Sequence, residues 1–426
     1  MKKKLAKTCS AAVAALISLS MLAGCGNSKT QPEVTSETTP AVTEPPTVLA
    51  EIKCHTEIPE LTASPLDIPD NDALKFVKDM RLGWNLGNTF DAVDDSGSIT
   101  NDLDLESAWV GTKTTRSLID NVKNAGFNTV RVPVSWHNHV DSDFKINEPF
   151  MDRVQQVVDY VIDNDMYCII NIHHDNDAKY FYPNSENLES SEKYVAAIWS
   201  QVAERFKDYD EKLIFEGLNE PRLVGTNVEW WLNPNDPKCV DSVSVINRLM
   251  QVFTDTVRAS GGNNANRYLM IPGYDASADG ALNDGYALPN DTADNKLIVS
   301  VHAYTPYNFA LQGPTENGST DTFDINSTDS TGQITSFMDN LYNKFVSKGI
   351  PVVIGEFGAR NKNNNSQART DFAAFYILTA RERGITCCWW DNNAFFGNGE
   401  NFGLFHRDTS AWRCGEIAIA MDKYAD

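Results

Sequence analysis

Two stretches decide the fold: Phe215-Glu216-Gly217-Leu218-Asn219-Glu220-Pro221 and Ile354-Gly355-Glu356-Phe357-Gly358. Each places a Glu at the carboxyl end of an apolar, strand-like run. If the two runs are strands of one parallel barrel, both carboxyl groups open onto the same face of that barrel. The simpler alternative is that each Glu only ends its strand or caps the next helix.

Six further runs of the same kind accompany these two along the chain. They are short and rich in Val, Ile and Leu, as expected of strands that are covered on both faces. The expected strands are Leu82–Asn85, Thr129–Pro133, Tyr167–His173, Leu213–Asn219, Tyr268–Pro272, Leu297–Tyr304, Pro351–Glu356 and Ile385–Trp390.

Helix-like segments fall between the expected strands, and several end before a Gly suited to a helix C-cap. This alternation predicts an α/β chain folded as a (β/α)8 TIM barrel. A doubly wound open sheet is the alternative, but Gly83-Trp84-Asn85-Leu86-Gly87-Asn88 is not the phosphate loop that usually follows its first strand. The expected helices are Thr114–Ala125, Phe150–Asn164, Ser191–Asp208, Asp241–Ser260, Gln333–Ser347 and Gln367–Arg383.

The composition narrows the class of partner. The chain has 426 residues, 42% of them hydrophobic, and a formal net charge of −22. This supplies a large core and argues against global disorder. The negative charge argues against nucleic acid as a partner, because phosphate binding needs a basic face. We expect a monomer that acts on a neutral polymer.

Residues 1–25 are expected to be a lipoprotein-type export signal. A Lys-rich start precedes an apolar stretch from about Ala11 to Ala23, which is too short to span a bilayer as a mature helix. Leu22-Ala23-Gly24-Cys25 resembles a bacterial lipobox. The resemblance implies lipidation of Cys25 and anchoring at the cell surface, on the outer face of the cytoplasmic membrane. Ordinary signal cleavage with free secretion is the alternative.

The rest of the chain divides into a linker and one catalytic domain. Residues 26–50 are rich in Thr, Pro and Glu and are typical of an extended linker, and the domain is expected at residues 51–426. The 8 cysteines lack the spacing of a disulfide framework or zinc site, so no bridge is assigned. Cys168, Cys387 and Cys388 lie in strand-like runs and are expected in the core.

Polar and aromatic residues crowd the carboxyl ends of the expected strands, where a barrel carries its chemistry. Paired carboxylates on that face are the apparatus for splitting a glycosidic bond. In strand order the residues are Asn85 and Asn88; Arg131, Trp136, His137 and His139; His173, His174 and Asp175; Asn219 and Glu220; His302 and Tyr304; Glu356; and Trp390, Asp391 and Asn392.

Seven motifs, in order and each on its own strand, make the chain resemble glycoside hydrolase family 5, the cellulase family, and most closely its subfamily 4. The resemblance covers roughly Asn71 to Asp426. The motifs are Gly83–Thr89, Arg131–Trp136, Ile172–His174, Leu218–Pro221, Val301–Tyr304, Gly355–Gly358 and Trp389–Asn392.

The resemblance implies a retaining endo-β-1,4-glucanase that needs no cofactor and no metal. Glu220 is expected to be the general acid/base and Glu356 the nucleophile, with their carboxyl groups about 5 Å apart. Arg131 and Tyr304 are expected to keep Glu356 ionised and oriented, and pairing of Arg131 with Glu216 is the alternative. Glu220 is expected to start protonated, because an ionised Glu356 raises its pKa.

Other residues are expected to contact the sugar chain. Asn219 resembles the residue that bonds the 2-hydroxyl of the cleaved sugar, and Trp390 the aromatic floor beneath it. Of Trp230 and Trp231, one is expected to touch substrate, and Trp109 is expected to pack. The remaining expected substrate contacts are His302, Asn85, His173, His174, Trp136 and His137, with loop aromatics Tyr182, Tyr307, Phe309, Phe395 and Phe396 lining a long cleft.

The substrate implied by the resemblance is cellulose, mixed-linkage β-glucan or xyloglucan, and xylan is the alternative. Residues 313–332 are interpreted as a mobile rim or lid. Two other classes stay open. One is an inactive carbohydrate-binding lipoprotein. The other is a metal-dependent hydrolase built on His173, His174, Asp175 and Asp177, which is disfavoured because adjacent residues of a strand point to opposite faces.

Overall fold

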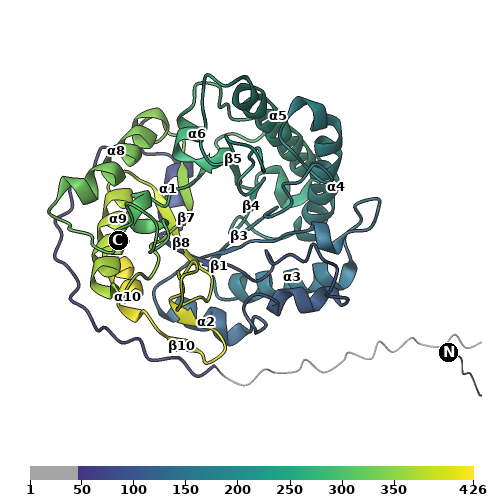
Figure 1. Cartoon of the computed structure of the whole chain (residues 1–426). Helices are drawn as coiled ribbons and strands as arrows, with labels where there is room; N and C mark the ends of the chain where they lie inside the picture. Colours follow the sequence, from purple (N-terminus) through teal and green to yellow (C-terminus); the bar gives the residue numbers. More distant parts are fainter. Residues whose placement is uncertain (1–46) are drawn as a thin grey trace, which may run out of the picture. The chain divides into compact units, whose positions relative to one another are not determined.

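Eight parallel strands close into a barrel in the order of the chain, with β8 paired to β1 (Figure 1). The structure is a computed structural model that describes residues 47–426. The expected signal peptide, Cys25 and most of the expected linker lie outside the described residues. The (β/α)8 barrel is confirmed. Its strands are β1 Leu82–Leu86, β2 Thr129–Val132, β3 Tyr167–Asn171, β4 Leu213–Glu216, β5 Leu269–Ser277, β6 Leu297–His302, β7 Val352–Phe357 and β8 Thr386–Asp391.

Helices form a ring outside the strands (Figure 1). The α-helices are α1 Asp72–Asp79, α2 Arg116–Asn124, α3 Glu148–Ile162, α4 Leu188–Phe206, α5 Pro237–Ala259, α6 Ala278–Leu282, α7 Tyr307–Ala310, α8 Thr328–Lys344, α9 Ser366–Arg381 and α10 Gly415–Tyr424. Short 3₁₀ turns lie at Asp102–Ser107, His137–His139, Ser185–Asn187, Gly262–Ala265 and Val346–Lys348, and β9 Phe405–His406 pairs with β10 Ala411–Trp412.

The six predicted helices are present, and side-chain caps set several of their starts. Thr115 caps α2 by accepting a hydrogen bond from the Leu118 amide. Ser327 accepts one from Asp329 and starts α8 at Thr328, five residues before the predicted Gln333. A capping hydroxyl satisfies a backbone N–H that the helix cannot satisfy itself, which fixes where the helix begins.

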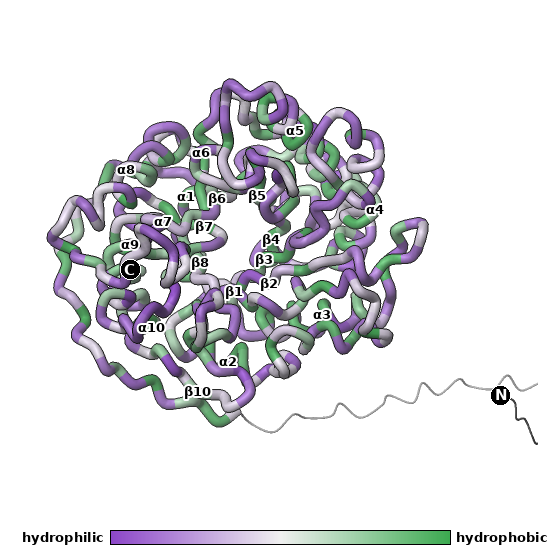
Figure 2. The backbone as a smooth tube through the Cα atoms, in the orientation of Figure 1, coloured by the Kyte–Doolittle hydropathy of each residue, from purple (hydrophilic) through white to green (hydrophobic). Residues whose placement is uncertain are grey.

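Hydrophobic side chains fill both faces of the strands. Inside the barrel, Ile169, Ile214 and Val353 pack with Phe76 and Val77 of α1, so this helix closes the amino end of the barrel. A larger cluster joins the outer faces of the strands to the helices. The helices alternate between hydrophobic and hydrophilic segments in Figure 2, as expected when one face of each is buried.

The segment before α1 runs along the outside of the barrel (Figure 1). Its backbone is held in turn by α2, α10 and α9: the amide of Ala50 donates to Asn121, that of Leu61 to Tyr424, and that of Leu66 to the carbonyl of Glu382. Residues 47–50 therefore belong to the same compact unit as the barrel.

Residues 313–332 are not a free lid. The ammonium of Lys362 donates hydrogen bonds to the carbonyls of Asn308 and Thr320 and to the Ser319 hydroxyl. Asn365 adds a bond to the Asp321 carbonyl. A buried cation and an amide therefore pin the segment to the loop after β7, which sequence composition alone did not reveal.

The structure also describes the state of the cysteines and the character of the helices within residues 47–426. Its six cysteines are free thiols, and Cys168, Cys387 and Cys388 are buried as predicted. Within residues 47–426, no helix combines the length and the apolar character needed to cross a membrane.

Candidate active site

A polar layer lies inside the barrel just below its carboxyl end. It is formed by Asn85, Arg131, Asn171, Glu216 and Ser300, all of them buried. The strand register places Asn85 beside Arg131 and Asn171 beside Glu216. Because alternate residues of a strand share a face, Ile169, Ile214 and Ile298, two positions before Asn171, Glu216 and Ser300, also face the interior and form the apolar layer beneath.

Arg131 is the centre of this layer. One of its terminal nitrogens lies 2.8 Å from Oε1 of Glu356, and the other lies 2.6 Å from Oε2 of Glu216. It also donates to the side-chain oxygens of Asn85, at 3.0 Å, and Asn219, at 2.7 Å. Arg131 therefore pairs with both carboxylates that the sequence offered, Glu356 and Glu216, because one guanidinium bridges them. A planar cation with several donors suits this arrangement.

Glu356 is turned into the barrel by an irregularity in β7. Ile354 and Phe357 both pack in the outer cluster although they are three residues apart, so Gly355 and Glu356 together occupy the inner face. The hydroxyl of Tyr304 donates to Oε2 of Glu356 at 2.9 Å. With Arg131 on the other oxygen, the carboxylate has a partner on each side.

Glu220 lies across the mouth, four residues after β4 ends. Its Oε1 is 2.9 Å from Nδ1 of His302, and Nη1 of Arg222 is 3.6 Å from its Oε2. A carboxylate oxygen of Glu220, a ring nitrogen of His302 and a carboxylate oxygen of Glu356 all lie within 4.8 Å of one another. The two strand ends thus bring the predicted pair together.

The charges around the pair differ from the sequence-based expectation. Burial would lower the pKa of His302, but Glu356, Glu216 and Glu220 raise it to about 10. Burial raises the pKa of Glu220, but the hydrogen bond and charge of His302 outweigh this, so its pKa lies below the ordinary value. Burial, with help from Glu220, raises the pKa of Glu356 against the opposing charges of His302 and Arg131. The expected raised pKa of Glu220 is therefore wrong, because His302 faces it directly.

Two residues expected to contact substrate, Asn85 and Trp136, have structural positions instead. Asn85 is fully buried and donates to the carbonyls of Gly355 and Trp389 while accepting from Arg131. Trp136 lies in the outer cluster, with its indole N–H bonded to the carbonyl of Asn171. Asn85 therefore supports the site from within β1, and Trp136 supports it from the outer face of the strands.

His137 is held by a carboxylate behind the site. Its Nδ1 lies 2.5 Å from Oδ1 of Asp175, which also accepts the backbone N–H groups of Trp136 and His137. The imidazole is mostly buried and makes an aromatic contact with Tyr180. It therefore orders the loop after β2, and its expected contact with substrate is not supported by this position.

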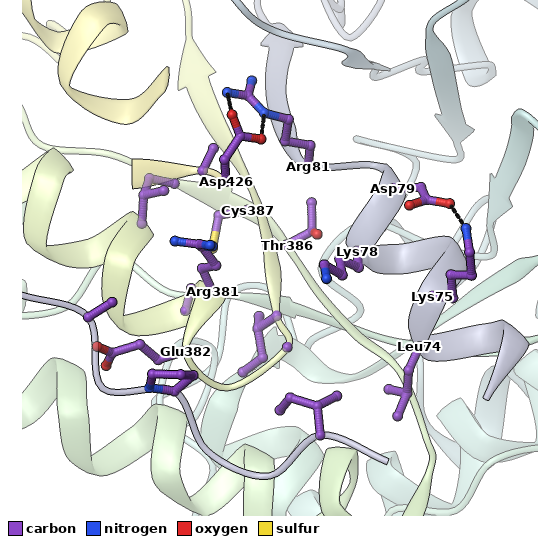
Figure 3. A pocket seen from close by; sticks show the side chains of 18 of the residues that line it. Leu74, Lys75, Lys78, Asp79, Arg81, Arg381, Glu382, Thr386, Cys387 and Asp426 are labelled. Atoms are coloured by element: carbon purple, nitrogen blue, oxygen red, sulfur yellow. Dashed lines mark hydrogen bonds and ion pairs between the residues drawn. The ribbon is translucent and has the colours of Figure 1, made fainter. Parts of the chain in front are cut away.

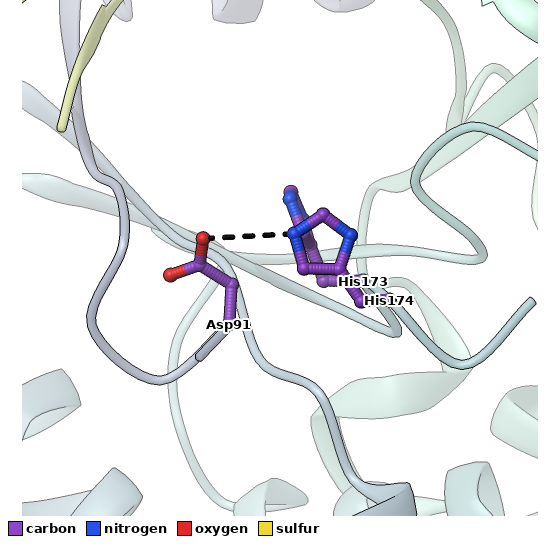
Figure 4. Close-up of side chains that lie close together, drawn as sticks. All are labelled: Asp91, His173 and His174. Carbon is purple, nitrogen blue, oxygen red and sulfur yellow. Dashed lines mark ion pairs between the residues drawn. The ribbon is translucent and has the colours of Figure 1, made fainter. Parts of the chain in front are cut away.

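His173 and His174 stand next to the mouth and beside Asp91 (Figure 4). Nε2 of His174 lies 3.9 Å from Oδ2 of Asp91. The ring of His173 is parallel to that of Trp390, with centroids 5.8 Å apart. Burial lowers the pKa of His174 to about 4 and that of His173 well below its ordinary value, so both rings are neutral.

Asp91, His173 and His174 also offer one ligand atom each within 4.8 Å of one another. A carboxylate and two imidazoles are ligands that many transition metals accept. Asp91 is already occupied, because it accepts the backbone N–H groups of Asn88 and Thr89. The cluster differs from the His173, His174, Asp175 and Asp177 set considered from sequence, since Asp175 binds His137 instead.

Aromatic residues on the loops are divided between surface and core. Trp230 and Trp231 are both exposed, and the guanidinium of Arg222 covers the ring of Trp230 at 3.9 Å. Trp231 meets Tyr307 edge to face at 5.9 Å. The loops after β4 and β6 therefore share an aromatic surface beside Glu220.

The other loop aromatics depart in part from expectation. Phe309 is buried against Phe323 and Phe372, so it is not a cleft residue. Trp109 is 44% exposed and lies 6.0 Å from the ring of His174, so it does not pack in the core as expected. Tyr182 donates to the carbonyl of Val224, Phe395 is nearly buried and Phe396 is exposed.

Sequence reasoning missed Asn171 and Ser300, and it considered Glu216 only as an alternative partner of Arg131. The register of the closed barrel turns all three side chains inward. Asp275, two residues before the end of β5, has a left-handed conformation and one buried carboxyl oxygen that has no partner among the described residues. Burial, together with the nearby Glu220, raises its pKa well above the ordinary value. Sequence analysis did not predict the irregularity of β5 between Pro272 and Ser277.

Comparison with known proteins identifies the family. The model of Cellulase (glycosyl hydrolase family 5) matches residues 93–396. The chain belongs to glycosyl hydrolase family 5. It is 42% identical to Endoglucanase B of Ruminococcus albus over 375 residues, which are 87% of this chain and 83% of that protein. This family 5 chain is a glycoside hydrolase.

Solved structures agree with this assignment and refine it. The family 5 lichenase of Caldicellulosiruptor sp. F32 is 60% identical, with a TM-score of 0.86, over 87% of this chain and all of that one. A GH5-4 broad specificity endoglucanase of Ruminococcus champanellensis with bound cellotriose is 46% identical, with a TM-score of 0.76, over 84% of this chain and 100% of that one. The resemblance to subfamily 4 is confirmed.

A cavity of about 850 Å³ lies at the opposite end of the family 5 barrel (Figure 3). Its wall includes Leu74 and Lys78 of α1, Arg81 before β1 and Thr386 at the start of β8. The guanidinium of Arg81 is occupied by Asp426. Since barrel enzymes work at the carboxyl ends of their strands, this cavity is separate from the candidate site.

Proposed function

We propose that the protein is a retaining endo-β-1,4-glucanase in which Glu356 is the nucleophile and Glu220 the general acid/base. The observation that carries this proposal is the approach of their carboxylate oxygens to within 4.8 Å. Retaining glycosidases hold the two carboxyl groups about 5–5.5 Å apart, whereas inverting enzymes leave about 6.5–9.5 Å for a water molecule. The short separation supports direct attack by one carboxylate.

In the first step, an oxygen of Glu356 attacks the anomeric carbon and the bond from that carbon to the leaving sugar oxygen breaks. The leaving oxygen takes a proton from Glu220, which receives it from the protonated imidazole of His302 along the 2.9 Å contact, so Glu220 ends the step as a carboxylate. In the second step, Glu220 removes a proton from water, the water oxygen bonds to the anomeric carbon, and Glu356 leaves as the carboxylate.

The surrounding residues position the reaction. Arg131 and Tyr304 each bond one oxygen of Glu356, which fixes the attacking carboxylate and stabilises its charge when it leaves. Asn219, held by Arg131 at 2.7 Å, is proposed to contact the sugar 2-hydroxyl. Trp390 offers an aromatic face at the mouth, against which sugar C–H groups pack.

The substrate is proposed to be a soluble or amorphous β-1,4-linked glucan, with mixed-linkage β-glucan first. The lichenase and the broad specificity endoglucanase reported above support this choice by their names and by their identity to this chain. The exposed aromatic residues Trp230, Trp231 and Tyr307 also suit an open cleft that accepts a long chain. Xyloglucan, cellulose and xylan are the substrates to compare with it.

Product stereochemistry tests the mechanism. The domain from Thr47 onward is incubated with barley mixed-linkage glucan and followed by proton NMR. Initial release of the β-anomer is expected, because two displacements at the anomeric carbon restore its configuration. Initial release of the α-anomer would assign inversion and remove Glu356 as the nucleophile. Absence of cleavage of all four polymers would favour an inactive carbohydrate-binding protein.

We further propose that the protein is exported and anchored to the membrane through a lipid on Cys25. The support is the Leu22-Ala23-Gly24-Cys25 sequence at the end of an apolar stretch. The full chain, expressed in a bacterium with radiolabelled palmitate, should carry label and partition with membranes. Cys25→Ser should lose both properties. Equal labelling of the two forms would leave free secretion as the better proposal.

A further inference from the structure

Asn171 occupies the end of β3 with every polar atom of its side chain in use. Its Oδ1 accepts the backbone N–H of Val134 at 3.1 Å. Its Nδ2 donates to Oε2 of Glu216 at 2.9 Å and lies 3.1 Å from Nδ1 of His173. The side chain is 1% exposed, so water cannot replace these partners.

The orientation of this amide follows from its neighbours. The Val134 N–H can only donate, so it needs the oxygen of Asn171. Burial would raise the pKa of Glu216, but Arg131 and His302 lower it to about 2, so this carboxylate can only accept. It therefore needs the nitrogen of Asn171. Two independent partners exclude the flipped amide, in which oxygen would face carboxylate and N–H would face N–H.

The amide orientation settles the proton position on His173. The second hydrogen of Asn171 Nδ2 points to Nδ1 of His173, which must accept it. The ring is neutral, so its single proton lies on Nε2. Within residues 47–426, Nε2 has no hydrogen-bond partner and is not fully buried, so a small polar group can reach it on the ring that lies parallel to Trp390. We propose that Asn171 is a positioning residue that holds His173 in the Nε2–H tautomer, so that His173 donates a hydrogen bond to a sugar hydroxyl.

The tautomer has a second consequence for the cluster with Asp91 and His174. With Nδ1 bonded to Asn171 and Nε2 carrying the proton, neither nitrogen of His173 offers a free lone pair. A metal would have to displace that proton and leave the N–H of Asn171 facing a new N–H. His173 therefore serves as a fixed donor to substrate.

Ring nitrogen NMR of the unmodified protein tests the tautomer directly. The chain has 7 His residues, so ¹⁵N-histidine labelling gives few signals. The spectrum of His173→Gln identifies which pair belongs to His173. We expect a bare Nδ1 and a protonated Nε2 at pH 7. The reverse pattern in the unmodified protein would overturn the proposal, whatever the substitutions do.

Asn171→Asp tests whether the amide is the cause. A carboxylate at this position accepts rather than donates, so the His173 proton should move to Nδ1. We expect kcat/KM for cellotetraose to fall about tenfold, the size of one lost hydrogen bond to a neutral hydroxyl. Asn121→Asp is the matched control. Asn121 is a buried residue of α2 that accepts a hydrogen bond from the amide of Ala50, far from the site, so this substitution should leave kcat/KM unchanged. An unmoved proton in Asn171→Asp would overturn the proposal.

The His173→Gln background separates this role from support of Glu216. Gln presents an amide donor that does not depend on a tautomer, so Asn171→Asp should cost less in this background than in the parent. Equal losses would assign Asn171 to Glu216 alone. The kinetic tests rest on the proposed glucanase function, whereas the NMR test does not, so inactivity of the parent and a wrong tautomer remain distinguishable.

Discussion

Nδ1 of His302 lies 2.9 Å from Oε1 of Glu220, and this contact sets the charge of both side chains. Burial would lower the pKa of His302, but Glu356, Glu216 and Glu220 raise it to about 10. The same contact holds the pKa of Glu220 below its ordinary value despite burial. The positive imidazole of His302 thus lies among the carboxyl groups of Glu216, Glu220 and Glu356. Arg131 pairs with Glu216 and Glu356 but not with Glu220.

The His302 contact predicts a pH dependence of stability. A raised folded-state pKa means that the stabilisation is fully present below the ordinary value of 6.5 and is lost as pH rises through about 10. The lowered pKa of Glu220 means that its contribution is present above 4.5 and is lost as pH falls. His302→Gln should therefore flatten the alkaline decline. Thermal unfolding of both proteins from pH 6 to pH 10 measures this, and parallel declines would contradict it.

Gly87 lies so close to the ring of Trp390 that a larger residue should displace the aromatic face proposed to contact the sugar. A Cβ atom at Gly87 would lie 2.8 Å from the Trp390 ring and 3.0 Å from the Asp391 carbonyl. Gly87→Ala should push the ring out of place, raising KM for cellotetraose roughly tenfold and destabilising the fold by about 1–3 kcal/mol. Gly399→Ala, where a Cβ meets nothing within 4 Å, is the control. An unchanged KM would mean that Trp390 does not define the subsite.

The sequence predicted the barrel and the paired Glu residues because both depend on local signals. A Val- and Ile-rich run followed by a polar motif is readable without knowing its neighbours, and Glu220 and Glu356 end such runs. Asn171 could not be found in this way, and Glu216 was only an alternative partner of Arg131, because the roles of both residues depend on which face of the strand points inward. That choice is made by the closed register, which pairs Asn171 with Glu216.

The errors have the same origin. Trp136 lies four residues after the end of β2, in the loop at the mouth, yet its ring packs in the outer cluster and its indole N–H donates to the carbonyl of Asn171. Phe309 lies in a loop sequence but packs in α7 against Phe372. Direction after a strand end depends on tertiary partners such as Asp175, which is 38 and 39 positions from the residues whose amides it binds.

Azide rescue tests the role of Glu220. Glu220→Ala should lower kcat on glucan by roughly 10²–10⁴-fold, because the leaving oxygen loses its acid. An aryl cellobioside with a good leaving group should still form the glycosyl-enzyme, and azide should then release the β-glycosyl azide. Glu229 is a matched control, because both side chains are 18% exposed and both pair with Arg222. Absence of rescue in Glu220→Ala, or equal rescue in Glu229→Ala, would count against the assignment.

The buried ring of His139 should make the folded protein less stable as the pH falls below 7. Its ring stacks on Phe150 with centroids 3.4 Å apart, and neither ring nitrogen has a hydrogen-bond partner among the described residues. Asp102 is 3.8 Å away, beyond hydrogen-bond distance. Burial lowers the pKa of His139 to about 3. Keeping this ring neutral in the folded state costs nothing above the ordinary pKa of 6.5. As the pH falls from 6.5 toward 3, the unfolded chain binds a proton that the folded protein does not, so the stability of the fold decreases.

The cost of keeping His139 neutral should reach about 2 kcal/mol between pH 7 and pH 5, since each pKa unit corresponds to about 1.4 kcal/mol. His139→Phe keeps the stack on Phe150 and removes the titrating group, so its urea midpoint should shift less between the two pH values. His55→Gln, at an exposed position, should shift as the parent does. If His139→Phe loses as much stability as the parent at pH 5, the acid sensitivity lies elsewhere, with carboxylates such as Glu216 as the next groups to test.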